Sequence, residues 1–315
     1  MDQLIQVLII GLANGLIFAL VALGYTLVYG IIELINFAHG DVFMLGSMLA
    51  FGLIAPVASG GLGVFSITAA TPVPLMVVQI VATLLICMIV MAFLNVSIER
   101  VAYRPLRHAP KLAPLISAIG MSFVLQNVGL VFGGAYQRTI EPIFPTDNLL
   151  APLGITEIVI TPAQVFVAVV TVPLLILLTW FVGRTRQGRA MRATAQDPDT
   201  AGLMGVDVNR TIALTFLIGG ALAGAAGVVQ ILYNNYTVWN LGFRFGLNSF
   251  TAAVLGGIGN LQGAVLGALV IGEINALSDF YLSTNWTQAI VFGVLIGILV
   301  FKPTGLLGQQ LADRA

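Results

Sequence analysis

The chain has 315 residues, of which 58% are hydrophobic and only 8% are charged, and its formal net charge is zero. A soluble domain usually carries about 25% charged residues, so the composition excludes an ordinary soluble protein and indicates lipid as the main solvent. The zero net charge gives no indication of nucleic-acid binding. The single cysteine, Cys87, excludes an internal disulfide, and His39 and His108 lie far apart in sequence. We therefore predict no metal site.

A helix of about 20 apolar residues crosses a bilayer core. In chain order, the candidate spans are 5–29, 31–56, 74–98, 113–133, 163–182, 211–233, 247–258, 262–281 and 285–301. The run 247–258 is short for a full crossing and is typical of a half-helix or a re-entrant element. We expect an all-α integral membrane protein with one transmembrane domain over 1–315, about eight or nine transmembrane helices, and broken or re-entrant segments.

The basic residues predict an orientation. Eleven of the 13 lysines and arginines fall in segments 99–112 and 183–210 and in the tail after 301. Because loops rich in lysine and arginine stay in the cytoplasm, we expect these segments and the C-terminus to be cytoplasmic and the N-terminus to lie outside. The external loops are then 57–73, 134–162 and 234–246. The proline-rich loop 134–162 is typical of an ordered loop that could contact an external partner.

Small residues recur every four positions in several spans and predict close helix packing. They are Gly11 and Gly15; Gly219, Ala223 and Gly227; Gly259, Gly263 and Gly267; and Gly293 and Gly297. The simplest interpretation is packing within one chain. The alternative is that some of these faces slide against each other during gating.

The tract 33–41 places four polar or ionisable residues between two apolar runs: Glu33, Asn36, His39 and Asp41. Polar groups at membrane depth are costly unless they face protein or water. Either the tract lies at the inner interface, where water satisfies it, or it is a helix break that lines a cavity and belongs to a pathway or gate. A nearby glycine, Gly40, would permit a sharp turn.

The second basic segment contains the signals of a short helix. Asp197 is a typical N-cap, and Pro198 suits the first helical position. Gly205 can end such a helix, so we expect it near 198–204.

Two apolar residues of this short helix, Leu203 and Met204, lie in a segment predicted to be cytosolic. An exposed apolar patch on a short helix suggests a partner protein. The alternative is that the helix packs against the membrane end of its own bundle.

The glycine-rich tract 255–263 predicts an interruption, with Asn260 and Gln262 beside it. Broken helices in transporters often border the substrate route, whereas the simpler interpretation is a tight cytosolic turn between two crossings. Glu273 lies about mid-way along span 262–281. It is a candidate for ion coupling, or for interfacial placement or a hydrogen bond to a neighbouring helix.

These tracts carry a family resemblance. The run GYTLVYGIIELINFAHGDVFMLGS at 24–47 resembles the signature of permease subunits of branched-chain amino-acid ABC importers. Five further runs resemble the same family in the expected order: SIERVAYRPLR at 97–107, LISAIGMSFVLQN at 115–127, GRAMRATAQDPDTAGLMGVDVNR at 188–210, FTAAVLGGIGNLQGAVLGALVIG at 250–272 and YLSTNWTQAIVFGVLIGILVFKPTGLLG at 281–308. The chain most resembles the first of the two permeases of such a system, and loop 134–162 matches least well.

The resemblance implies an ABC importer permease bundle in a bacterial inner membrane. It also implies four kinds of partner: a second, related permease, two ABC ATPase subunits, an extracytoplasmic solute-binding protein and membrane lipid. The cytoplasmic segment at about 184–210 resembles the coupling segment that docks on an ATPase. The residues expected to couple to the ATPase are Asp197, Pro198, Ala201, Leu203, Met204, Gly205, Arg104 and Arg107.

The chain itself is not expected to be an enzyme. It has no G-x-x-x-x-G-K-[ST] phosphate loop, because its only lysines, Lys111 and Lys302, do not follow glycine. No cofactor is expected in this chain, since ATP and Mg²⁺ would bind to the ATPase subunits. Candidates for the translocation path or gate are Asn14, Tyr25, Glu33, Asn36, His39, Asp41, Asn260, Gln262 and Glu273.

The resemblance suggests branched-chain or other hydrophobic amino acids as substrates, with urea or short amides as an alternative. Two other kinds of transporter stay open: a stand-alone facilitator for a small neutral solute, and an ion-coupled secondary transporter. The short cytosolic helix favours the ATP-driven importer, because a facilitator needs no docking helix.

Overall fold

The computed structural model describes residues 2–107, 109–110, 112–154, 157–302 and 304–308. Two residues of the sequence analysis, His108 and Lys111, lie outside them. The α-helices are α1 (Asp2–Ile32), α2 (Ala38–Ile54), α3 (Val73–Ile98), α4 (Leu112–Gly133), α5 (Pro162–Arg184), α6 (Arg186–Gln196), α7 (Pro198–Leu203), α8 (Val208–Asn234), α9 (Leu241–Gly256), α10 (Leu261–Tyr281) and α11 (Thr284–Phe301). The shorter elements are η1 (Val57–Ser59), η2 (Glu99–Tyr103), η3 (Arg104–Leu106), η4 (Ala151–Leu153), β1 (Arg138–Thr139) and β2 (Tyr236–Thr237).

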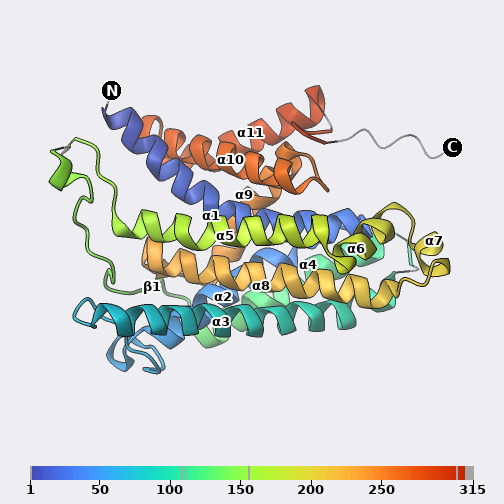
Figure 1. Ribbon diagram of the computed structural model, residues 1–315, viewed down its shortest axis with the longest axis horizontal. Helices are drawn as coiled ribbons and strands as arrows, with labels where there is room; N and C mark the ends of the chain where they lie inside the picture. Colours follow the sequence, from blue (N-terminus) through green and yellow to red (C-terminus); the bar gives the residue numbers. More distant parts are fainter. Residues whose placement is uncertain (1, 108, 111, 155–156, 303, 309–315) are drawn as a thin grey trace.

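The long helices run roughly along the longest axis of the molecule (Figure 1). The N-terminus lies at one end, and α6 and α7 lie at the other, which we call the α7 end. Seven helical stretches among the described residues are long and apolar enough to cross a membrane, and they include α1, α3 and α8. This confirms the prediction of an all-helical membrane protein.

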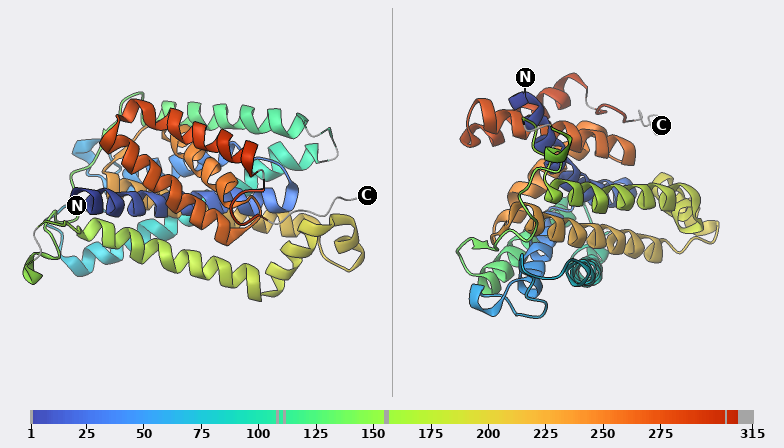
Figure 2. Two further views of the ribbon diagram at one scale, coloured as in Figure 1. Left: turned by 90° about the horizontal axis from the view of Figure 1, so that it is seen from above. Right: turned by 60° about the vertical axis from the view of Figure 1, so that its left-hand side comes forward.

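The core sits around α1 and α8. In their most apolar stretches, 67% of the residues of α1 and 72% of those of α8 are buried within the chain, against 11% in α11. A helix that is apolar on all sides is stable in a protein interior or in lipid. The peripheral helices, which include α3, α4, α5 and α11, therefore face lipid or another chain. Figure 2 shows the same helices on the outside of the bundle in two further views.

The predicted span 31–56 is wrong as one continuous helix. Helix α1 ends at Ile32, and the next residue, Glu33, has a left-handed φ of 52°. After residues 34–37 the chain turns back along α1, so the His39 ring lies 5.0 Å from the Tyr25 ring between centroids. Helix α2 therefore starts beside the interior of α1 rather than beyond its end.

Helix α9 differs from the prediction at its start. It begins at Leu241, so residues 241–246, expected in the external loop 234–246, are helical. A positive φ of 106° at Gly257 and of 92° at Gly259 allows the tight turn into α10. Leu306 donates its backbone N–H to the Leu255 carbonyl, at 2.8 Å between N and O, so the segment after α11 covers this turn.

The expectation that 134–162 is ordered holds for its described residues. Strand β1 pairs antiparallel with β2, which joins this loop to the segment between α8 and α9. The side chain of Asn148 accepts hydrogen bonds from the Leu150 and Ile160 amides, at 3.0 and 3.1 Å. The amide of Gln6 in α1 bonds both the N–H and the carbonyl of Val159. The described part of the loop is thus fixed to the end of the bundle where α1 begins.

Glycines set the closest helix contacts. A Cβ at Gly15 would lie 2.9 Å from the Cα of Leu269 in α10, and one at Gly227 would lie 2.4 Å from the Ser47 nitrogen in α2. Helix backbones approach closely at these positions. The interpretation of packing within one chain is wrong for Gly259, Gly293 and Gly297, because no neighbouring part of the described chain lies within 4 Å of a Cβ added there.

Candidate functional site: a central cavity and the α7 end

Helices α2 and α9 meet near their N-terminal ends through glycines. A Cβ at Gly40 would lie 2.4 Å from the Gly242 carbonyl oxygen and 2.8 Å from the Cα of Gly246. Such contacts leave no room for a side chain, so the two backbones touch. The crossing brings the first turns of two interrupted helices to one place inside the bundle.

A cavity of about 490 Å³ borders this crossing, between α1, α2, α4 and α9. We call it the central cavity. Its polar lining is Tyr25, Asp41, Ser122 and Gln126, and its aromatic lining includes Phe123 and Phe243. Pockets for small ligands are typically about 300–1,000 Å³, mostly apolar, and carry a few placed polar groups. The central cavity fits that description.

Asp41 lies in the first turn of α2 and is only 1% exposed. The hydroxyl of Ser122 in α4 donates a hydrogen bond to its Oδ2. Its Oδ1 has no hydrogen-bond partner among the described residues. A buried carboxylate oxygen without a partner is costly, and such groups in membrane segments are commonly functional.

The predicted path residues separate into several places. Tyr25 and Asp41 line the central cavity. Asn36 and His39 are buried close by, at the break between α1 and α2. Glu33 is exposed and borders a second cavity at the α7 end. The tract 33–41 therefore contains both an exposed residue, Glu33, and buried polar residues at a helix break beside a cavity, which are the two environments that the sequence left open.

The remaining path candidates lie elsewhere. Asn14 is half-buried on α1, and Glu273 of α10 lies against Gly11 of α1. Asn260 caps α10, since its side chain accepts from the Gly263 amide at 3.1 Å, and it also donates to the Leu307 carbonyl at 2.8 Å. Gln262 is exposed beside it. None of these four lines the central cavity as the structure describes it.

Sequence reasoning missed Ser122 and Gln126, which lie four residues apart on one face of α4. The sequence did contain a signal for these two residues, because two polar side chains within an apolar membrane span are unusual. It also missed Gly242 and Phe243, because they were assigned to a loop. Their proximity to Asp41 arises only from the crossing of α2 and α9.

At the α7 end, the short helix forms as predicted. The Asp197 side chain accepts from the amides of Asp199 and Thr200, at 3.0 and 3.1 Å, and so caps α7. Gly205 has a left-handed φ of 86° just after the helix, and its N–H donates to the Gly202 carbonyl. The sequence therefore fixes both ends of α7 by local capping.

The two apolar side chains of this helix point away from the chain. Leu203 is 88% exposed and Met204 is 81% exposed, whereas Ala201 is buried. This excludes the alternative that Leu203 and Met204 pack against the described part of their own bundle. Ala201 holds α7 on the protein from its inner side.

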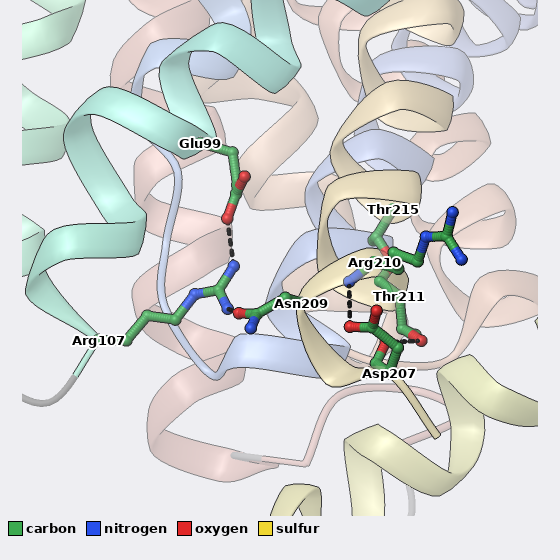
Figure 3. A network of polar contacts seen from close by, with 7 residues as sticks. All are labelled: Glu99, Arg107, Asp207, Asn209, Arg210, Thr211 and Thr215. Atoms are coloured by element: carbon green, nitrogen blue, oxygen red, sulfur yellow. Dashed lines mark hydrogen bonds and ion pairs between the residues drawn. The ribbon is translucent and has the colours of Figure 1, made fainter. Parts of the chain in front are cut away.

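A polar network ties the start of α8 to the end of α3 (Figure 3). Arg107 forms an ion pair with Glu99, which is only 1% exposed, and donates to the Asn209 side chain at 2.7 Å. Burial lowers the pKa of the Arg107 guanidinium, and the Glu99 carboxylate opposes that shift. Asp207 caps α8 by accepting from the Arg210 amide at 3.0 Å. The sequence analysis did not identify Glu99 or Asn209.

This network continues toward the helix break. Tyr103, in the η2 turn after Glu99, donates from its hydroxyl to the Asn36 side chain at 2.7 Å. Its ring also packs on Phe216 of α8, with 5.5 Å between centroids. Arg104 is exposed and, with Arg107, borders a cavity of about 640 Å³ between α7 and the break. Contacts thus run without a gap from α8 to the start of α2.

Comparison with known proteins gives the family. The model of the family described as "Branched-chain amino acid transport system / permease component" matches residues 7–299. The chain is 43% identical over 312 residues to the high-affinity branched-chain amino acid transport system permease protein BraD of Pseudomonas aeruginosa, covering 98% of this chain and 97% of that protein.

Two further relatives are also permease proteins. The chain is 41% identical to the permease protein LivH of Salmonella typhimurium, over 96% of this chain and 95% of that protein. It is 27% identical to the probable permease protein LivH of Methanocaldococcus jannaschii, over 91% and 85% of the two chains. No solved structure matches. On the family match and these near-complete alignments, the chain belongs to the family of branched-chain amino acid transport permease components.

Proposed function

We propose that this chain is the first permease of an ABC importer for branched-chain amino acids, and that α7 couples it to an ATPase. The observation that carries the proposal is the exposure of Leu203 and Met204 on a helix that its own caps hold in place. Exposed apolar side chains of this size mark protein-binding surfaces. The substrate class comes from the relatives, whose names state branched-chain amino acid transport.

A permease component is the non-catalytic part of an ABC transporter, and ATP is bound by separate ATPase subunits. We infer three protein partners: a related second permease, a pair of ATPases at the α7 end, and a solute-binding protein at the opposite end. The exposed periphery of α4 and α11 gives room for a second permease. The described residues of loop 134–162, at the opposite end, offer a surface for the binding protein.

The proposed orientation puts the α7 end in the cytoplasm and the N-terminus outside. The basic segment 183–210 and the 99–107 turn both belong to the α7 end. Positively charged loops are retained on the cytoplasmic side, which supports this assignment. It also puts α7 on the side where ATP is available.

The proposed coupling follows the contacts already described. Movement of α7 would be passed to α8 through the short connection 204–207, and from Asn209 to Arg107 and Glu99. From there, Tyr103 contacts Asn36 in the α1–α2 break. Packed side chains and rigid helices carry such coupling. The break and the central cavity would therefore respond to ATPase closure.

Co-purification tests this function. The chain is expressed with its second permease and candidate ATPases, as the wild type and as Leu203→Asp and Met204→Asp. We expect the wild type to retain the ATPases and each charged variant to lose most of them, because a charge in the docking surface has to be desolvated. Leu62→Asp is the matched control, since Leu62 is 69% exposed in the loop at the opposite end.

The variants are first compared for membrane yield and for a single size-exclusion peak, so that loss of ATPase is not confused with misfolding. If the wild type binds no ATPase, the importer function is wrong and a stand-alone facilitator becomes the better explanation. If the wild type binds and all three variants bind equally, α7 is not the coupling helix.

A further inference from the structure

The central cavity contains a single charged group. Of the described residues that line it, only Asp41 is ionisable to a charge near neutral pH, and neither lysine nor arginine is among them. Ser122 satisfies Oδ2, and Gln126 also faces this carboxyl. Oδ1 keeps no hydrogen-bond partner among the described residues. The described lining therefore includes a carboxylate with one oxygen that has no hydrogen-bond partner, and it includes no cation that would offset the charge.

Oδ1 is covered by the backbone of α9 rather than by a hydrogen-bond donor. It is buried, and a Cβ at Gly242 would lie 2.7 Å from it, so a side chain at this position would collide with the carboxylate. The crossing of α2 and α9 itself is made by glycine backbones and does not require a carboxylate. The partial positive charge at the first turns of both helices stabilises an anion here. These features suit a carboxylate kept for a ligand.

The rest of the lining suits an aliphatic group. Phe123 and Phe243, from α4 and α9, are 61% and 62% exposed in this chain, and Phe250 lies farther along α9. The Tyr25 ring lies 6.1 Å from the Phe250 ring between centroids. Aromatic faces attract a cation as well as covering apolar surface. A ligand with one ammonium group and one aliphatic chain would satisfy both parts of the cavity.

We propose that Asp41 binds the ammonium group of the transported amino acid in the central cavity, while the phenylalanine walls cover its aliphatic side chain. This inference rests on the proposed function, because it assumes that the substrate is an amino acid. It assigns a substrate-binding site to the permease itself, so that a solute released from a binding protein is recognised a second time inside the membrane.

The site can be tested without a transport assay, by comparing how fast a cationic and an anionic thiol reagent label a cysteine in the cavity. Gln126→Cys places a thiol in the cavity, and the one native cysteine, Cys87, is fully buried, so background labelling is low. The purified permease complex is treated with methanethiosulfonates that carry either an ethylammonium or an ethylsulfonate group. We expect the ratio of the ammonium rate to the sulfonate rate to be about tenfold higher than the same ratio for free cysteine in solution, because Asp41 attracts the ammonium reagent and repels the sulfonate.

In Gln126→Cys/Asp41→Asn this preference should fall to about the ratio seen with free cysteine in solution, since the attracting charge is gone. Leucine should slow the labelling of Gln126→Cys in the complex. If the two reagents react with Gln126→Cys at the solution ratio while Asp41 is present, the proposal is overturned. That outcome needs no Asp41 variant, so a folding defect in Asp41→Asn cannot conceal it.

Uptake gives the functional test. Proteoliposomes holding the complex, with ATP inside and the binding protein outside, are assayed with radiolabelled leucine at equal ATPase content. We expect Asp41→Asn to lower uptake by about tenfold or more, the loss typical of a hydrogen-bonded charge in a binding site. The matched control is Asp279→Asn, because Asp279 also accepts from a hydroxyl of another helix, Thr287, but lies outside the cavity.

The outcomes separate the two proposals. If the wild-type complex takes up no leucine, the proposed function fails on its own. If the wild type transports leucine and Asp41→Asn transports it equally well, the function stands and the role of Asp41 is wrong. An equal loss in Asp279→Asn and Asp41→Asn would also overturn the proposal, because the effect would then come from any lost carboxylate.

Discussion

The α2–α9 crossing and helix α7 are built in opposite ways. At the crossing, Gly40 and Gly242 bring two backbones into contact, and a buried carboxylate lies beside them. At α7, the helix is held by its own caps, while the side chains of Leu203 and Met204 are exposed. The first region is defined by what fits between helices, and the second by what it presents to another molecule.

The contrast indicates how each region should respond to substitution. A site made by backbone contact has no space to absorb an added methyl group, because protein interiors are close-packed. A capped surface helix accepts most side chains but depends on its few capping bonds. Stability measurements should therefore find large effects near the crossing and along the network that reaches it, and small ones at α7.

The largest effect is expected where the two regions are joined. Arg107→Ala removes the partner of Glu99, which is 1% exposed, and should lower the free energy of unfolding by about 3 kcal/mol, because an unpaired buried charge is left behind. Thermal unfolding of the purified protein in detergent measures this. Adding Glu99→Gln should recover most of the loss.

Arg104→Ala is the control for this change, because Arg104 is an exposed arginine only three residues before Arg107. Its loss should change the free energy of unfolding by no more than about 0.5 kcal/mol. Equal losses in Arg104→Ala and Arg107→Ala would mean that the Glu99 ion pair does not stabilise the connection. The double variant tests the same point, because it restores stability only if the unpaired charge is the cause.

The next effect concerns the crossing itself. Gly40→Ala would put a Cβ 2.4 Å from the Gly242 carbonyl oxygen, so one backbone has to shift, at a cost of about 2 kcal/mol. Gly120→Ala is the control, because nothing lies within 4 Å of a Cβ there and alanine favours a helix by about 1 kcal/mol. The two alanine variants should therefore move the unfolding temperature in opposite directions.

The same contrast explains what could be predicted from the sequence. The ends of α7 depend on neighbours in the chain, with Asp197 and Pro198 at the start and Gly205 just past the end, so local chemistry was sufficient. The class of the protein followed from composition, and the family from motifs spread over most of the chain. These features need no knowledge of which helices touch.

The crossing could not be predicted in this way. The predicted span 31–56 runs across a break at 33–37, and the polar residues of tract 33–41 indicated such a break only as one of two interpretations. The approach of Asp41 to Gly242 is a tertiary contact between residues 201 positions apart. Small-residue spacing was also ambiguous, since Gly15 packs on α10 whereas no neighbouring part of the described chain lies within 4 Å of a Cβ added at Gly293. The spacing shows that a helix face carries small residues, but it does not show which helix packs against that face.

The smallest effect should be local to α7 and leave the bundle unchanged. Asp197→Ala removes the side chain that accepts from the Asp199 and Thr200 amides, a loss of about 1 kcal/mol for a helix N-cap. Because α7 contributes little to the core, amide hydrogen exchange is the suitable measurement, and exchange within 198–205 should rise about fivefold.

Asp199→Ala is the matched control, as an exposed acid in the first turn that makes no side-chain cap. If exchange rose equally in both variants, charge near the helix start rather than the Asp197 cap would hold α7. If it spread into α8, the two regions would not be separable, and the contrast between a packed crossing and a self-contained docking helix would be wrong.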